Sequence, residues 1–132
     1  MNNFKYVAEF ELKTSVKMLF PYLATASGLQ EWFADKVITN HEKEFHFIWE
    51  GSEHFAKVAS RRTNAHIKFV FEPEPPHNQN TTLEFRITFN ELTQSTFLKV
   101  IDYSDMSDEA ELKAIWQQLI AKLRDVLGIT YA

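Results

Sequence analysis

Residues 81–90 read TTLEFRITFN and give the clearest structural signal in the chain, an alternation of polar and apolar side chains. Leu83, Phe85, Ile87 and Phe89 fall on one side of an extended backbone, while threonine, glutamate and arginine side chains fall on the other. A period of two is typical of a β-strand with one dry face and one wet face. The stretch therefore predicts an antiparallel sheet that covers a core on one side only.

The same alternation continues on both sides of this strand. It predicts further strands at residues 4–12, 37–40, 44–50, 54–61, 65–72 and 95–103. Large apolar side chains again share one face in two of these strands, namely Phe45, Phe47, Trp49, Ile67, Phe69 and Phe71. Most connections are short, which favours hairpins and an antiparallel sheet. Three prolines within residues 73–76 mark an exposed loop.

Residues 107–127 show the helical period instead. Their apolar residues recur at steps of three and four, namely Leu112, Ile115, Trp116, Leu119, Ile120, Leu123 and Leu127. Asp105, Ser107 and Asp108 are candidates for the N-cap, and Gly128 is a natural stop. A helix of about 21 residues would be about 30 Å long, which is enough to cross a small domain.

Two short helices are expected between the first strand and the rest of the sheet. Residues 14–15 can cap the first helix, in which Pro21 predicts a short, kinked or late-starting helix. Residues 27–28, Ser-Gly, are predicted to interrupt the helical run. A second helix then brings Trp32 and Phe33 onto one face.

These elements predict an α+β fold in one domain over residues 1–132. The apolar face of a seven-stranded sheet must be covered, and residues 107–127 form the element long enough to cover it. We therefore expect a curved antiparallel sheet wrapped around the C-terminal helix, with the two short helices closing one end of the groove.

The composition excludes several kinds of site. The chain has no cysteine, which excludes disulfides, thiolate zinc sites and cysteine nucleophiles. Its 14 basic and 18 acidic residues give a formal net charge of -4, so we expect no nucleic-acid partner. No stretch approaches about 18 uninterrupted apolar residues, and the N-terminus is unlike a signal peptide. We expect a cytoplasmic protein with no membrane span and no cofactor.

Three segments carry a family resemblance: LFPYLATASGLQEWFADKV (19–37), FHFIWEGSEHFAKV (45–58) and ELKAIWQQLIAKLRDVLG (111–128). Together they resemble the START-like proteins of the helix-grip (SRPBCC) superfamily, in particular small bacterial stand-alone domains of the branch of activator-of-heat-shock-ATPase homologues. The most specific pieces are the helix corner Gly28-Leu29-x-x-Trp32-Phe33 and the strand end aromatic-x-Trp49-x-Gly51. The resemblance implies a helix-grip fold with a cavity between the sheet and the last helix.

The aromatic content, 12 Phe, 4 Tyr and 3 Trp, suggests where a ligand would bind. Rings from the inner sheet face and the last helix would meet across the groove, where they either fill a core or line a cavity for an apolar or aromatic molecule. Trp32 and Phe33 would plug or gate its end. The candidate ligand-binding residues are Trp32, Phe33, Phe47, Trp49, Phe69, Phe71, Phe85, Ile87, Lys99, Trp116 and Ile120.

Other chemistry has weaker support. Lys99 shares parity with Phe97 and Ile101, which makes it a candidate for a buried charge that faces the groove. A position on the outer face or at the sheet edge is the favoured alternative. His46 and His66 are expected on the wet face, and no histidine spacing indicates a metal site. We assign no catalytic residue, because the candidate carboxylates lie at loop and helix ends.

Three hypotheses follow from this. The first is a non-enzymatic domain that binds a small hydrophobic ligand, and the second is a co-chaperone-like protein-interaction module with a filled core. The third and weakest is a cyclase or aromatase, for which Lys99, Tyr6 and Tyr103 would supply the polar groups. Both a monomer and a homodimer are compatible with the sequence.

Overall fold

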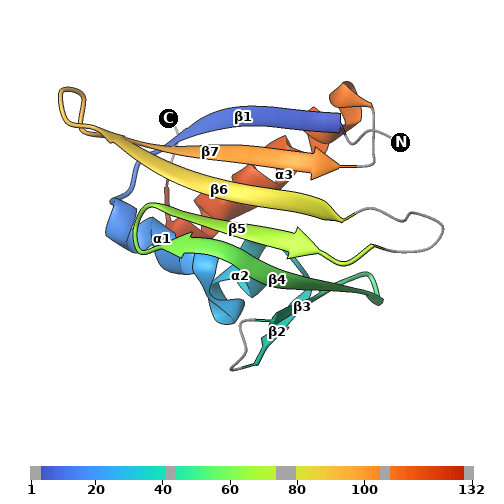
Figure 1. Ribbon diagram of the computed structural model, residues 1–132. Helices are drawn as coiled ribbons and strands as arrows, with labels where there is room; N and C mark the ends of the chain where they lie inside the picture. The colour runs from blue at the N-terminus through green and yellow to red at the C-terminus, as the bar shows by residue number, and fades with distance from the viewer. Residues whose placement is uncertain (1–3, 41–43, 74–79, 105–107, 130–132) are drawn as a thin grey trace.

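One curved antiparallel sheet and three helices make up the part of the chain that the computed structural model describes, residues 4–40, 44–73, 80–104 and 108–129 (Figure 1). In chain order the elements are β1 (Phe4–Leu12), α1 (Val16–Ala24), α2 (Ala26–Trp32), β2 (Lys36–Thr39), β3 (Glu44–Trp49), β4 (Ser52–Arg62), β5 (His66–Phe71), β6 (Thr81–Asn90), β7 (Ser95–Ser104) and α3 (Glu109–Leu127). All seven predicted strands are present, with ends within two residues of those expected from the sequence.

The strand order is β1-β7-β6-β5-β4-β3-β2, and every neighbouring pair is antiparallel. Strands β2 to β7 follow one another as hairpins, so each strand pairs with its neighbour in sequence. Strand β1 breaks this order. It is the first strand in the chain but pairs with β7, the last one, so that Phe4 is opposite Ser104 and Leu12 is opposite Thr96.

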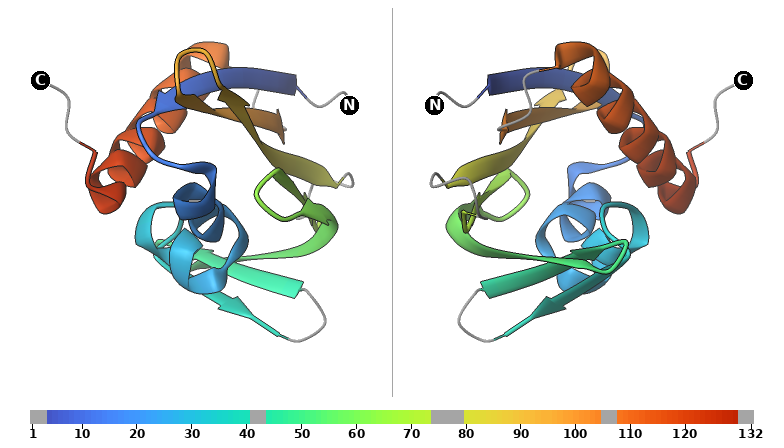
Figure 2. Two further views of the ribbon diagram at one scale, coloured as in Figure 1. Left: turned by 90° about the vertical axis from the view of Figure 1, so that its left-hand side faces the viewer. Right: turned by 90° about the vertical axis from the view of Figure 1, so that its right-hand side faces the viewer.

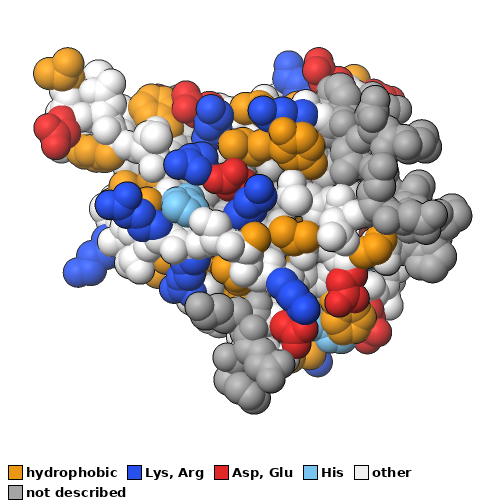
Figure 3. Space-filling model, viewed as in Figure 1, with side chains coloured by type: hydrophobic (Ala, Val, Ile, Leu, Met, Phe, Trp, Pro, Cys, Tyr) orange, Lys and Arg blue, Asp and Glu red, His pale blue; other side chains and the backbone are white. Residues whose placement is uncertain are grey.

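The inner face of the sheet is covered by all three helices (Figure 2). Helix α3 lies against β1 and α2, whereas α1 lies against β5 and β6 and α2 against β2. The predicted sheet wrapped around a C-terminal helix is confirmed, and the two short helices fill more of its inner face than we expected. The outer face carries charged side chains of both signs among scattered apolar ones (Figure 3).

The predicted break at residues 27–28 is wrong, because Gly28 lies inside α2. The break falls at Thr25, whose backbone N–H and hydroxyl both donate to the Pro21 carbonyl at 3.2 and 2.7 Å. The Thr25 hydroxyl also accepts the Gly28 N–H at 3.0 Å and so caps α2. Gly28 has a packing role instead, since a Cβ there would lie 2.1 Å from the Pro21 carbonyl oxygen.

The ends of the other helices follow their capping residues. Ser15 accepts the Met18 N–H at 3.1 Å, so α1 begins directly after it and continues through Pro21. Asp108 accepts the Glu111 N–H at 3.2 Å and caps α3; the other N-cap candidates, Asp105 and Ser107, lie outside the described residues. Gly128 ends α3 in the left-handed conformation, as predicted.

Candidate functional site

The deep part of the groove is a packed core. Rings from β3, β5 and β6 meet there: Phe47 and Phe69 are 5.6 Å apart in an edge-to-face arrangement, and Trp32 of α2 lies 5.7 Å from Phe85. Eight of the candidate ligand-binding residues belong to the buried core, namely Trp32, Phe33, Phe47, Phe69, Phe85, Ile87, Trp116 and Ile120. The filled-core alternative therefore holds for the deep part of the groove, where these side chains stabilise the fold.

Trp32 and Phe33 occupy different positions at the end of the groove. Trp32 is the plug, since it is fully buried and its indole N–H donates to the Tyr22 carbonyl at 2.8 Å. Phe33 lies where the core ends. Its ring centroid is 5.2 Å from that of Trp49 and 6.0 Å from that of Trp116, and Phe33 also lines a pocket.

This pocket, called the end pocket below, has a volume of about 380 Å³ and opens to solvent where β5 and β7 end and β6 begins. Its apolar lining consists of Phe33, Trp49, Phe71, Leu83, Leu112, Ile115, Trp116 and Leu119. Its polar lining consists of His54, Thr81, Thr82, Asp102 and Tyr103. Four of the candidate ligand-binding residues therefore line a cavity: Phe33, Trp49, Phe71 and Trp116.

Two hydrogen bonds fix the tryptophan walls of the end pocket. The indole N–H of Trp49 donates to the Phe33 carbonyl at 2.6 Å, and that of Trp116 donates to Asp102 Oδ2 at 3.0 Å. The single N–H group of each indole is thus bound to a protein acceptor. The remaining ring surface is apolar and is available to line the pocket.

The turn between β3 and β4 places Trp49 at the pocket. Trp49 pairs directly with Ser52, and the two residues between them, Glu50 and Gly51, have φ angles of 49° and 83°. Positive φ at both central residues is the geometry of a tight hairpin turn and favours glycine. Asp35 holds the turn from outside, since its Oδ2 accepts the Glu50 N–H at 2.7 Å. The Trp49-x-Gly51 motif is therefore a hairpin signal that also orients a pocket wall.

Asp102 and His54 are pocket residues that the sequence reasoning did not select. Residue Asp102 is paired across the sheet with Leu83 and Tyr6, both buried on the inner face, so its side chain also points inward. His54 is opposite Phe47, and its ring contacts the Trp49 ring at 5.1 Å. The sequence contained a signal for Asp102, because residues 98, 100 and 102 share one face of strand β7 and Leu98 and Val100 are apolar.

Negative charge lies close to the buried end of this pocket. Tyr6 is buried beside Asp102, and its pKa is raised above the ordinary value of 10.0 by burial first, and then by the charges of Glu109 and Asp102. Glu109 belongs to the first turn of α3, where Asp108 and Glu111 add further negative charge. Burial and these carboxylates therefore disfavour the ionised form of Tyr6 at this end of the inner face.

Lys99 does not line the end pocket, so the prediction that it could bind a ligand there is wrong. Leu98 and Val100 on either side of it are fully buried on the inner face, so Lys99 points to the outer face, between Glu9 of β1 and Arg86 of β6. Parity with Phe97 and Ile101 had made Lys99 a candidate for the groove, whereas the outer face was the alternative favoured from the sequence. The main polar group of the cyclase hypothesis is thus absent from the groove.

The histidines of the outer face have local partners. The ring of His46 stacks on Phe55 at 4.3 Å, and His66 Nε2 lies 2.8 Å from the Ser60 hydroxyl. Both lie on the wet face, as predicted from parity. Among the described residues, no group of three histidine or carboxylate side chains is close enough together to hold a metal ion.

Two larger hollows, of about 530 and 540 Å³, lie at the opposite end of the sheet beside the hairpin of β6 and β7. Their described linings are largely polar and include Glu9, Glu11 and Glu91. An apolar ligand would gain less buried apolar area there than in the end pocket. The end pocket is therefore the better candidate site.

A curved sheet that encloses helices and leaves a small apolar pocket at one end defines a helix-grip protein. The family model of the START-like superfamily domain matches residues 1–129, and this chain belongs to that superfamily. No relative was found by sequence among curated proteins. None of the described helices is long and apolar enough to cross a membrane.

Solved structures agree with this fold. The Aha1 dimer of Colwellia psychrerythraea is similar with a TM-score of 0.76 and 18% identity, covering 94% of this chain and 96% of that one. A Bacteroides fragilis protein is 29% identical with a TM-score of 0.64 and covers 100% of this chain and 96% of that one. DynU16, from the dynemicin biosynthetic locus, is 14% identical with a TM-score of 0.77 over 94% of this chain and 47% of that one.

Proposed function

We propose that this protein is a non-enzymatic START-like domain that binds a small hydrophobic molecule in the end pocket. The observation that carries the proposal is the pocket itself, about 380 Å³ between the sheet and α3, with Phe33, Trp49, Phe71 and Trp116 in its walls. Small-molecule sites are usually apolar concavities of roughly 300–1,000 Å³ with a few placed polar groups. The end pocket meets both criteria, since Asp102 and His54 lie among its apolar walls.

The geometry also limits the ligand. The core below the pocket is closed by Phe47, Phe69 and Phe85, each fully buried, so a guest would occupy the mouth of the groove and not its whole length. The proposal is therefore for a molecule of modest size, such as a medium-length acyl or alkyl chain or a small aromatic compound.

Binding can be tested with the neutral apolar dye Nile red, followed by dye emission and by quenching of the two wall tryptophans. We expect saturable binding, and we expect Ile115→Trp to weaken it at least tenfold, because this 38% exposed side chain lines the pocket and a larger ring would fill it. Ile38→Trp is the matched control, since Ile38 is 45% exposed on β2 and lies outside the pocket. Non-saturable binding, or equal binding by the Ile115 variant, would refute the proposal.

A protein-interaction module is the second candidate, favoured by the packed inner groove and by similarity in fold to the Aha1 dimer. Light scattering of the purified chain separates a monomer from a homodimer. If Nile red fails to bind and the chain forms a stable dimer, the interaction module becomes the better proposal.

A further inference from the structure

We infer that this protein forms a homodimer through β1, whose open edge pairs antiparallel with β1 of a second copy about a two-fold axis at Val7. The inference goes beyond the proposed function, because it concerns a different surface of the molecule. It rests on the open edge of β1, on the direction of its backbone groups, and on the order of its side chains.

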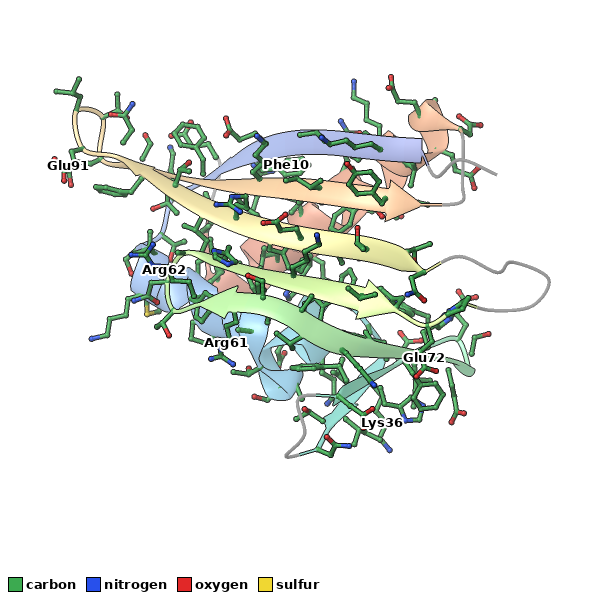
Figure 4. The ribbon with its side chains drawn as sticks, in the orientation of Figure 1. Phe10, Lys36, Arg61, Arg62, Glu72 and Glu91 are labelled. Carbon is green, nitrogen blue, oxygen red and sulfur yellow. The ribbon has the colours of Figure 1, made fainter. Side chains whose placement is uncertain are left out.

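The two edge strands of the sheet differ in how well they are protected. Figure 4 shows Phe10 on β1 and Lys36 on β2 at opposite edges of the sheet. Strand β2 has four residues, and its Val37 N–H donates to Gln30 Oε1 of α2 at 3.0 Å. Strand β1 has nine residues, and among the described residues no side chain bonds to the backbone of residues 5–10. A long open edge is a template for pairing with another chain.

The backbone groups that face this edge belong to alternate residues of β1. The Glu11 carbonyl accepts a hydrogen bond from Arg124 Nη2 at 3.0 Å, so it points away from β7. The direction alternates along an antiparallel strand, so the N–H and C=O groups of Lys5, Val7 and Glu9 point to the same open side. Arg124 occupies the edge at Glu11, which limits the open stretch to the residues before it.

The side chains of β1 are complementary to the same strand read in the opposite direction. When Val7 is placed opposite itself, Lys5 is opposite the second copy's Glu9, and Tyr6 is opposite the second copy's Ala8. Opposite charges that directly face each other stabilise a strand pair. Val7 is 45% exposed in the single chain and would be covered by its own symmetry mate. The strand is therefore self-complementary, as a two-fold interface requires.

The charges on the outer face favour the same arrangement. Glu9 is opposite Lys99 of β7, and it is exposed on its other side. Lys5 is also exposed, and its Nζ lies 5.7 Å from the centre of the Tyr103 ring. In the dimer, the Glu9 carboxylate would lie between Lys99 of its own copy and Lys5 of the second copy. Each negative charge would then have a positive neighbour on both sides.

Other registers lose this complementarity. A pairing centred on Ala8 would place Val7 opposite Glu9, and Lys5 opposite Glu11, whose edge carbonyl already accepts a hydrogen bond. A pairing centred between two residues would place an outer-face side chain opposite an inner-face one, which one continuous sheet does not allow. The register centred on Val7 pairs an apolar side chain with an apolar one and each charge with its opposite.

Sedimentation velocity of the purified chain at several concentrations tests for the dimer. We expect a concentration-dependent dimer, because one strand from each copy makes a small interface. Lys5→Glu alone and Glu9→Lys alone should each weaken it by about tenfold or more, since the two-fold axis repeats the like-charge contact. An equimolar mixture of the two variants should restore dimerisation, because each copy supplies the charge that the other lacks.

Glu72→Lys is the matched control for these charge changes. Glu72 is exposed and directly follows β5, and Figure 4 shows it away from β1. This variant should dimerise as the wild type does. If it weakens the dimer as much as Glu9→Lys, net charge and not the β1 edge explains the effect, and the inference fails.

Single cysteines test the register, since the chain has no cysteine of its own. Directly opposite residues have Cα atoms roughly 4.5–5.5 Å apart, which a disulfide can span. Val7→Cys should therefore form an intermolecular disulfide under mild oxidation. Ala8→Cys, at the centre of the competing register, should not. Ile38→Cys should not either, although Ile38 on β2 is as exposed as Val7, at 45%.

Several results would overturn the inference: a chain that is monomeric at every concentration, a dimer that neither charge variant weakens, or a mixture that does not reassociate. A disulfide in Ala8→Cys or Ile38→Cys as efficient as that in Val7→Cys would also overturn it. Misfolding cannot imitate the expected result, because rescue by mixing requires both variants to be folded. The proposed function survives these failures, since none of the described lining residues of the end pocket belongs to β1.

Discussion

Replacing Gly28 by alanine tests whether a close helix contact, and not helix propensity, determines this position. A Cβ at residue 28 would lie 2.1 Å from the Pro21 carbonyl oxygen and 2.7 Å from the Tyr22 Cα, whereas such contacts are essentially never shorter than 3.0 Å. The Pro21 carbonyl would have to retreat by nearly 1 Å, from 2.1 to at least 3.0 Å. That carbonyl accepts two hydrogen bonds from Thr25, so the movement strains the joint between α1 and α2.

The two effects of this substitution have opposite signs. Propensity alone predicts that alanine in a helix stabilises by about 1 kcal/mol over glycine. Overpacking costs about 1–3 kcal/mol, and we expect the upper end because the clashing atoms belong to the backbone. The net expectation is a loss of about 2 kcal/mol in the free energy of unfolding.

Urea denaturation followed by far-UV circular dichroism measures this loss. Ser27→Ala is the control, because Ser27 is exposed in the same turn of α2 and its replacement should change stability by no more than about 0.5 kcal/mol. If Gly28→Ala is as stable as the wild type, or more stable, the contact has no energetic importance and our account of the helix corner is wrong.

Two other measurements test the core and the inner face. Phe33→Ala should lower the free energy of unfolding, measured by urea titration, by about 3–5 kcal/mol. Phe89→Ala should lower it by less than about 1.5 kcal/mol, because Phe89 is 45% exposed. Equal losses for the two variants would contradict the packing described. Because the pKa of Tyr6 is raised above 10.0 in the folded state, its contribution to stability is complete below pH 10 and falls as the pH rises toward the folded value. Tyr6→Phe should abolish this part of the alkaline destabilisation, and an identical pH profile for both proteins would count against it.

The sheet could be predicted from the sequence because its strands alternate strictly. Leu83, Phe85 and Ile87 face a core and their neighbours face solvent, and this pattern requires no knowledge of the rest of the chain. The position of Gly28 could not be predicted in this way. A glycine that interrupts a helix and one that lets two helices touch look alike in sequence, and the difference lies in the Pro21 carbonyl on another element.

The candidate site was harder to predict than the fold. Strand β7 carries apolar side chains on both faces, with Leu98 and Val100 inside and Phe97 and Ile101 outside, so parity alone did not show which row faced the core. Lys99 was therefore considered for the pocket, and Asp102 was among the candidate carboxylates set aside because they lie near loop and helix ends. The neighbouring β1 and β6 settle the question, because they pair Asp102 with two buried side chains.

The pairing of β1 with β7 has a consequence for how the chain is made. Strand β1 is synthesised before the other described elements, but its partner β7 follows β6 in the chain. The hairpins from β2 to β7 can form as they are synthesised, because their contacts are local. During that interval β1 lacks its sheet neighbour, with Tyr6 and Leu12 still uncovered, so the nascent chain passes through a stage in which an apolar strand edge is open to chaperones or to other chains.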